Sequence, residues 1–268
     1  MKKLVISLFT GIVSISTIQS AKATINFFDD FSTYTNGNLV GQGPWLQTST
    51  SATTPVQVNG GSAILGTSGQ DVYAPLTSPI LITDGSSFYI GATVNITSAQ
   101  SGGDYFLHFT PTVGNSSIFS ERLFVKSSST GFVFGYDGSS GGTVNYGSTV
   151  LSLNTTYNIV MSYTGVSGLT NDTFSLYVNP TDTSTEGNNT AYLISGYIGT
   201  SAESTNVAAI NLRQGSTTSA PSVIVDALSV GTTFAEVAPM IAPVPEPSTL
   251  AMTALGGVAC LVAIRRRR

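Results

Sequence analysis

The sequence has very few of the residues on which most catalytic and metal sites depend. Its only cysteine is Cys260 and its only histidine is His108. Cys260 lies in an apolar run near the C-terminus, so the rest of the chain can form no disulfide bond. One histidine and no other cysteine disfavour a zinc site with the usual ligands. A Ser-His-Asp triad would depend on His108, and no Gly-x-Ser-x-Gly nucleophile elbow between a strand and a helix accompanies it, so we interpret it as a structural residue of a strand.

Positive charge is also scarce once the two ends of the chain are set aside. Residues 24–236 contain only three basic residues, Arg122, Lys126 and Arg213, against thirteen acidic ones, which gives a charge of about −10. Nucleic acid is therefore not an expected partner, because binding phosphates needs a basic face. An acidic exterior suits solubility, divalent cations or neutral glycans.

Charged helix formers are sparse, and no stretch shows a convincing amphipathic helical period. Short runs of β-branched and aromatic residues recur instead, separated by turn residues. Tyr157, Ile159 and Met161 point one way and the residues between them the other, as in a sheet with one face on a core. The expected strands are residues 63–65, 88–96, 104–110, 121–126, 131–136, 156–163, 172–178, 207–212 and 222–230. This pattern predicts an all-β fold, an antiparallel β-sandwich or jelly roll.

The N-terminus has the three parts of a secretory signal peptide. Lys2 and Lys3 form a basic start, and residues 4–18 form a short apolar stretch. Ala21 and Ala23 then give the small-x-small pattern that signal peptidase cleaves. We therefore expect a signal peptide at residues 1–23 and a mature chain that begins at Thr24, with an uncleaved anchor as the alternative.

The C-terminus combines a proline-rich element, an apolar run and a basic end. The element is Val244, Pro245, Glu246 and Pro247, and the cluster after the run is Arg265, Arg266, Arg267 and Arg268. The two prolines favour an extended, accessible peptide. The apolar run, residues 249–264, is short for a transmembrane helix of about 20 residues. The arginines would hold its end on the cytoplasmic side, which places the body outside the inner membrane. Residues 24–236 are then a β-sandwich domain and residues 237–243 a linker.

This arrangement resembles the PEP-CTERM sorting signal of Gram-negative bacteria, over residues 244–268. The resemblance implies recognition by an exosortase, a membrane-embedded enzyme, and cleavage near the Pro-Glu-Pro element. It also implies export, transient anchoring through residues 249–264, and association with the cell surface or with extracellular polysaccharide. An ordinary C-terminal anchor is the alternative interpretation.

A second resemblance covers the body and involves three segments in order. They are residues 28–32 followed by 43–45, residues 157–160 leading into 171–180, and residues 225–233. Together they are similar to concanavalin A-like (laminin-G-like) domains of exported bacterial proteins. The resemblance implies two curved antiparallel sheets with the first and last strands adjacent. Glycanases of this fold carry Glu-x-Asp-x-Glu on one strand, and its absence here disfavours glycoside hydrolysis.

Calcium is the metal that the body suits best, because carboxylate and carbonyl oxygens are plentiful. The second resemblance implies a calcium site where the first and last strands meet, and Asp30 and Asp226 occupy the matching segments. The alternative is that Asp30 caps a turn and Asp226 is a polar residue at a strand edge. Trp45, the only tryptophan, could stack on a sugar, but we interpret it as a hydrophobic plug near a sheet edge.

These features predict an exported, non-catalytic protein of the cell surface or extracellular matrix. Exosortase and signal peptidase process it, and it associates with extracellular polysaccharide. The alternatives are a lectin-like module that binds a specific glycan and, third, a polysaccharide-active enzyme.

Overall fold

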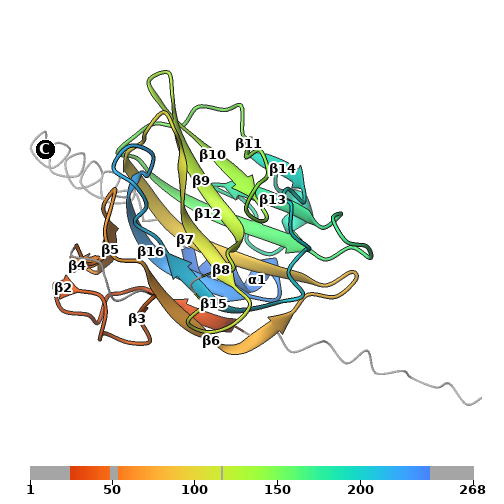
Figure 1. Ribbon diagram of the computed structural model, residues 1–268, viewed down its shortest axis with the longest axis horizontal. Coiled ribbons are helices and arrows are strands. Elements are labelled where there is room, and N and C mark those ends of the chain that lie inside the picture. The colour runs from red at the N-terminus through yellow and green to blue at the C-terminus, as the bar shows by residue number, and fades with distance from the viewer. Residues whose placement is uncertain (1–24, 49–53, 116, 242–268) are drawn as a thin grey trace, which may run out of the picture.

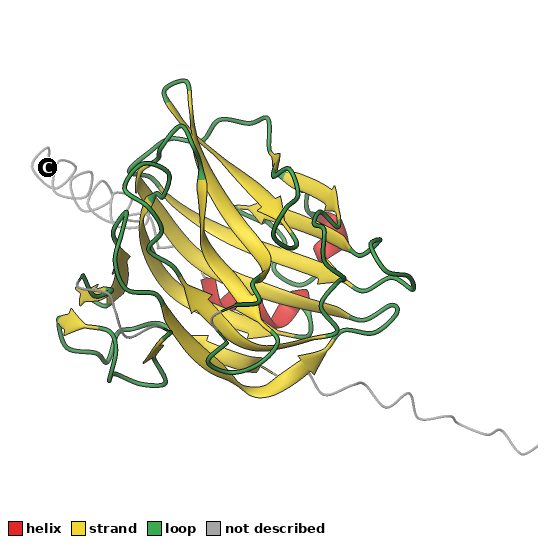
Figure 2. Ribbon diagram, viewed as in Figure 1, coloured by secondary structure: helices red, strands yellow, loops and turns green. Residues whose placement is uncertain are grey.

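The computed structural model describes residues 25–48, 54–115 and 117–241, which form two β-sheets packed face to face (Figures 1 and 2). Every strand pairing within them is antiparallel. The predicted all-β antiparallel sandwich is confirmed. All nine expected strands are present, with bounds that differ by at most a few residues.

The larger sheet has nine strands and contains both ends of the domain. In spatial order its strands are β14 (Leu193–Gly196), β13 (Thr173–Val178), β12 (Thr156–Thr164), β7 (Ser87–Ser98), β16 (Ser222–Gly231), β5 (Ser62–Leu65), β4 (Gln57–Asn59) and β2 (Gly37–Asn38). The first strand, β1 (Ile25–Asp29), pairs with β16, with Phe27 opposite Val230. The first and last strands are therefore adjacent.

The second sheet has seven strands. In spatial order they are β11 (Asn145–Tyr146), β10 (Gly131–Asp137), β9 (Ser120–Ser128), β8 (Asp104–Thr110), β15 (Asn206–Leu212), β6 (Val72–Leu81) and β3 (Leu46–Gln47). Figure 1 shows β8, β9, β10 and β15 in front of β7, β12 and β16.

The core between the sheets is apolar and rich in aromatic rings. Phe88 of β7 meets Phe109 of β8 edge to face at 5.3 Å, and Tyr136 of β10 stacks on Phe174 of β13 at 3.9 Å. Each pair joins one sheet to the other. Alternation along each strand sends every second side chain into this core. Burying apolar surface stabilises the fold by about 25 cal/mol for each Å² removed from water.

A short helical segment covers part of the outer face of the nine-stranded sheet. It consists of α1 (Phe234–Val237) and the 3₁₀ turn η2 (Ala238–Ile241). Thr233 and Glu236 form a capping box, which satisfies free N–H groups at the start of α1. Phe234 and Val237 are buried against Val160 and other residues of the sheet. The described part of the segment expected to be a linker, residues 237–243, thus packs on the sandwich.

The expected signal peptide and C-terminal apolar run, residues 1–23 and 249–264, lie outside the described residues. In the part of the chain that the structure describes, no helix is long and apolar enough to cross a membrane.

Candidate functional site

A row of polar side chains crosses five strands on the outer face of the seven-stranded sheet. It consists of Tyr73 of β6, Asn211 of β15, His108 of β8, Arg122 of β9 and Asp137 of β10. Strand register places Tyr73 opposite Asn211, Asn211 opposite His108, and Arg122 opposite Asp137. Their neighbours along the strands, including Leu107, Leu123 and Leu212, are core residues, so the row faces away from the core. We call these five residues the polar row.

Several buried atoms of the polar row have no hydrogen-bond partner among the described residues. They are both ring nitrogens of His108, Nε of Arg122 and Oδ1 of Asn211. His108 is 2% exposed and Asn211 1%. A buried polar atom without a partner is costly, and native structures usually supply one in the form of water or a ligand. The row therefore holds hydrogen-bond donors and acceptors that the described residues leave without partners, although the atoms themselves are not exposed.

The imidazole of His108 is neutral under ordinary conditions. Burial lowers its pKa to about 3, and the positive charges of Arg213 and Arg122 lower it further. The rings of Tyr105 and Phe119 pack edge-on against it, with centroids at 5.3 and 4.9 Å. A neutral imidazole offers one donor and one acceptor, which suits a hydroxyl group better than a charged one. The expectation that His108 is a strand residue is confirmed, but its unpartnered nitrogens were not foreseen.

The three cations of residues 24–236 lie around this same face. The guanidinium groups of Arg213 and Arg122 lie over the Tyr105 ring, at 4.1 and 5.1 Å from its centroid. Lys126 lies 5.2 Å from the centroid of Tyr146.

Both arginines are also neutralised by carboxylates. Arg122 binds Asp137 at 2.8 Å and Arg213 binds Asp104 at 2.7 Å. The face thus offers charged groups in pairs rather than a net positive charge. Such paired donors and acceptors favour hydroxyl-rich, uncharged ligands over polyanions.

The two residues of the expected calcium site lie where β1 and β16 meet. The pKa of Asp226 is raised, first by burial and then, after the opposing hydrogen bond from the Ala227 N–H, by the negative charges of Asp30 and Asp29. The pairing of Asp29 with Leu228 brings the end of β1 beside this part of β16. Asp226 lies at a bulge of β16, where Ala227 has a φ of 47° and its N–H donates to Asp226 Oδ1 at 2.7 Å.

Asp30 also makes the contacts of a turn cap. Its Oδ1 accepts hydrogen bonds from the Ser32 N–H at 3.1 Å and the Ser32 hydroxyl at 2.7 Å, and the hydroxyl contact is the main cause of its lowered pKa. No group of three or more His, Cys, Asp or Glu side chains within the described ranges could hold a metal ion. A calcium ion held by Asp30 and Asp226 would need backbone carbonyls as its other ligands, and the site stays a prediction.

Trp45 is a buried plug, as expected. Its side chain is fully buried, its ring stacks on Phe31 at 5.8 Å, and its indole N–H donates to Asp29 Oδ2 at 2.7 Å. A buried ring offers no face to a sugar. Trp45 therefore contributes to the fold.

The residues expected to direct sorting and signal cleavage lie outside the described part of the chain. They are Ala21, Ala23, Val244, Pro245, Glu246, Pro247 and the four terminal arginines. Residues 243–268 match the family model of the PEP-CTERM protein-sorting motif. The predicted sorting motif is thus confirmed. No curated protein sequence matches the chain.

Solved structures of similar fold include lectin-type and glycosidase-type sandwiches. The globular domain of calreticulin from T. cruzi is 8% identical with a TM-score of 0.51, over 81% of this chain and 92% of that one. The endo-1,3-beta-glucanase of Streptomyces sioyaensis is 11% identical with a TM-score of 0.45, over 81% and 98%. Domain 4 of the arabinanase AbnA from Geobacillus stearothermophilus is 11% identical with a TM-score of 0.46, over 82% and 98%. At such low identity the calreticulin likeness shows the fold alone.

Proposed function

We propose that this chain, which ends in a PEP-CTERM sorting motif, is an exported, non-catalytic protein of the cell surface or extracellular matrix. The match over residues 243–268 carries the proposal. Such a motif implies processing by an exosortase, export and transient membrane anchoring. Signal peptidase would remove residues 1–23 during export, with Ala21 and Ala23 at its recognition site.

The proposed role of the body is to associate with extracellular polysaccharide through the polar row. Sugar hydroxyls are both donors and acceptors, and could pair with Asn211 Oδ1, Arg122 Nε and the nitrogens of His108, which lack protein partners. Aromatic rings and salt-bridged arginines border the row. The same observation favours the second candidate, a lectin-like module selective for one glycan.

The proposal excludes catalysis because of how carboxylates are arranged on this face. Asp104 and Asp137 each form a salt bridge with an arginine. A retaining glycosidase needs one carboxylate as nucleophile and a protonated one as acid, about 5 Å apart. Release of reducing sugar from the host's own polysaccharide by the purified chain would overturn this part of the proposal.

Sorting is tested by comparing the full chain with one that lacks residues 244–268, both expressed in the natural host. The full chain should be retained at the surface, while the truncated chain should pass into the medium or stay in the periplasm. Identical localisation of the two chains would remove the central claim.

Ligand binding is tested with a glycan array and with the host's polysaccharide. Asn211→Leu should weaken binding about tenfold or more, because a buried acceptor for sugar hydroxyls is lost. Asn158→Leu is the matched control, since Asn158 lies on a strand of the other sheet. Saturable binding of one glycan would favour the lectin-like module, and equal binding by both variants would contradict a role for the polar row.

A further inference from the structure

The segment after the last strand docks on the sandwich at a place that is shaped to receive it. We call residues 234–241, which comprise α1 and η2, the strap. Phe234, Val237 and Ala238 are buried against the outer face of the nine-stranded sheet. The strap is therefore part of the folded domain, although it lies beyond the last strand.

Two glycines of the sheet leave room for the strap. A Cβ atom at Gly91 of β7 would lie 2.7 Å from both the Val237 carbonyl oxygen and Ser229 Oγ. The serine hydroxyl can rotate away, but the carbonyl oxygen is fixed in the strap backbone. A Cβ atom at Gly231 would lie 2.8 Å from Glu236 Oε2. Gly91 stands in the middle of a long strand, where glycine weakens pairing, and the close approach of the strap explains its presence there.

Two tyrosines held by one carboxylate form the seat for Phe234. The rings of Tyr89 of β7 and Tyr177 of β13 contact the Phe234 ring edge to face, with centroids at 6.1 and 5.6 Å. Their hydroxyls donate to the two carboxylate oxygens of Glu186, at 2.9 Å each. Glu186 thereby fixes both rings without any contribution from the strap.

The carboxylate of the strap bonds locally. Glu236 Oε2 accepts hydrogen bonds from the Thr232 N–H at 2.8 Å and the Thr233 N–H at 2.9 Å, and Thr233 completes the capping box. These bonds run between the strap and the residues just before it. Docking on the sheet depends instead on the apolar contacts of Phe234 and Val237, which can break without disturbing the strand ladder.

The sorting motif begins very close to the end of the strap. Ile241 is the last residue of η2, and the Pro-Glu-Pro element begins at Pro245. An extended chain spans at most about 3.5 Å per residue, so a docked strap keeps Pro245 within about 14 Å of Ile241. The apolar run begins at Thr249, which can lie no more than about 28 Å from Ile241. An enzyme that acts at the membrane would have to reach the motif past the folded body.

We propose that the docked strap restricts the access of the exosortase to the sorting motif, and that release of the strap sets the rate of processing. Release would free residues 234–241 and let Pro245 move about 42 Å from Thr233, roughly three times its reach from a docked Ile241. A reaction that needs a minor open state is slowed in proportion to the fraction that is open. The inference rests on the proposed function, in which an exosortase cleaves near Pro245.

The test follows loss of the unprocessed full-length chain in the natural host by pulse-chase labelling. Two changes should each speed processing about threefold or more, by independent routes. Gly91→Ala places a methyl group against the Val237 carbonyl and detaches the strap without altering its sequence. An insert of about eight glycine and serine residues between Ile241 and Ala242 lengthens the tether while the strap stays docked.

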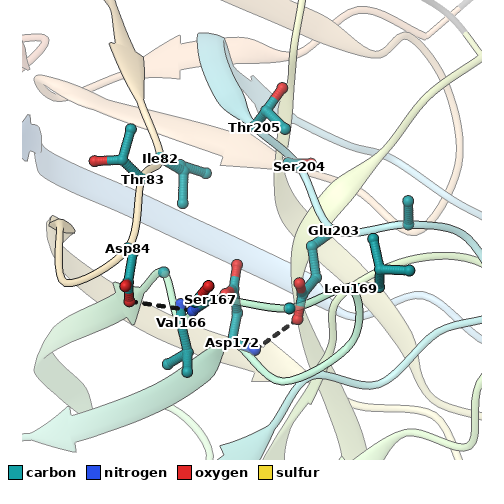
Figure 3. Close-up of a pocket in the computed structure, with 13 residues that line it drawn as sticks. Ile82, Thr83, Asp84, Val166, Ser167, Leu169, Asp172, Glu203, Ser204 and Thr205 are labelled. Atoms are coloured by element: carbon teal, nitrogen blue, oxygen red, sulfur yellow. Dashed lines mark hydrogen bonds between the residues drawn. The ribbon is translucent and has the colours of Figure 1, made fainter.

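Glu203→Ala is the matched control for a general loosening of the body. Glu203 accepts a hydrogen bond from the Asp172 N–H beside a pocket of about 280 Å³, which three connections between strands line (Figure 3). The described residues that line this pocket include none of the strap. Glu203→Ala should therefore be processed at the rate of the unmodified chain. A glutamate-specific protease, added to the purified chains in detergent, should cut after Glu236 faster in Gly91→Ala than in either of the others.

A chain in which Pro245, Glu246 and Pro247 are all replaced by alanine separates the strap from the sorting proposal. If this chain is not processed but the unmodified, Gly91→Ala and lengthened chains are processed at equal rates, the strap proposal is overturned alone. Faster processing of Gly91→Ala without faster processing of the lengthened chain, or unchanged cutting after Glu236 in Gly91→Ala, would also overturn it. If no chain is processed, or if the alanine-substituted chain is processed normally, the proposed function fails and the strap proposal fails with it.

Discussion

Asp29 accepts a hydrogen bond from the indole nitrogen of Trp45 at 2.7 Å, in a place where both side chains are buried. The same carboxylate accepts from the Tyr34 hydroxyl at 2.5 Å and the Phe31 N–H at 2.8 Å. Burial, and after it the hydrogen bond to Asp29, raise the pKa of the Tyr34 phenol well above its usual range. One carboxylate therefore organises the loop that follows β1.

Replacing this carboxylate should destabilise the sandwich strongly. Asp29→Ala would leave three donors unpaired, and we expect a loss of roughly 3 kcal/mol in the free energy of unfolding. Urea titration measures it. Asp29→Asn keeps an acceptor and should lose less, while a loss below about 0.5 kcal/mol for Asp29→Ala would contradict the role assigned to it.

Glu121 should make the protein less stable as the pH rises. Its pKa is 4.5 in an ordinary environment and about 8 in the folded chain, mainly because of burial. The unfolded chain releases this proton at lower pH than the folded chain does. The stability that protonated Glu121 contributes is therefore fully present below pH 4.5 and is lost as the pH rises to about 8. Above that pH the free energy of unfolding no longer changes because of this group.

The measurement is the free energy of unfolding of the unmodified chain and of Glu121→Gln across this pH range. Relative to the variant, the unmodified chain should lose roughly 2–5 kcal/mol between the two pH limits. The other titrating groups are the same in both chains, so their effect on the pH dependence of stability cancels in the comparison. Parallel curves would show that Glu121 ionises normally in the folded state.

Phe234 should contribute to stability although it lies beyond the last strand. Its ring is buried and packs edge-on against Tyr177 at 5.6 Å and Tyr89 at 6.1 Å. Phe234→Ala should lower the free energy of unfolding by about 3 kcal/mol. The exposed neighbour gives the control, Ala235→Ser, with an effect within about 0.5 kcal/mol. Equal stabilities would mean that α1 is detached in solution.

Calcium should stabilise the junction of β1 and β16 if Asp30 and Asp226 bind it. A cation there would relieve the repulsion that helps to raise the pKa of Asp226. Calcium should then raise the melting temperature, EDTA should reverse the change, and Asp226→Asn should abolish it. Asp182→Asn, at a partly exposed carboxylate in the loop after β13, should respond like the unmodified chain. A melting temperature that changes with neither calcium nor EDTA would refute the site.

The strands that the sequence failed to reveal show what periodicity cannot detect. β6 is ten residues long but contains Pro75 and Pro79, which usually argue against a strand. Beyond Tyr73 its outer edge has no partner strand among the described residues, because β3 pairs only with Val72 and Tyr73. A proline on a free edge breaks no ladder bond, so β6 tolerates both.

The polar row could not be predicted because its residues come from five strands. Asn211 follows His108 by about a hundred positions, and only the pairing of β8 with β15 brings them together. The sequence did offer one signal, the scarcity of cations in the body. Arg122, Lys126 and Arg213 all lie around that face, each over an aromatic ring.

The helical segment that ends at Ile241 bears on how the proposed anchor would hold the domain. It packs on the outer face of the nine-stranded sheet, while the polar row lies on the outer face of the other sheet. Under the proposed anchoring through residues 249–264, the face that carries the polar row would be opposite the face where the chain leaves the domain, so a long polymer would reach it without crossing the attachment point.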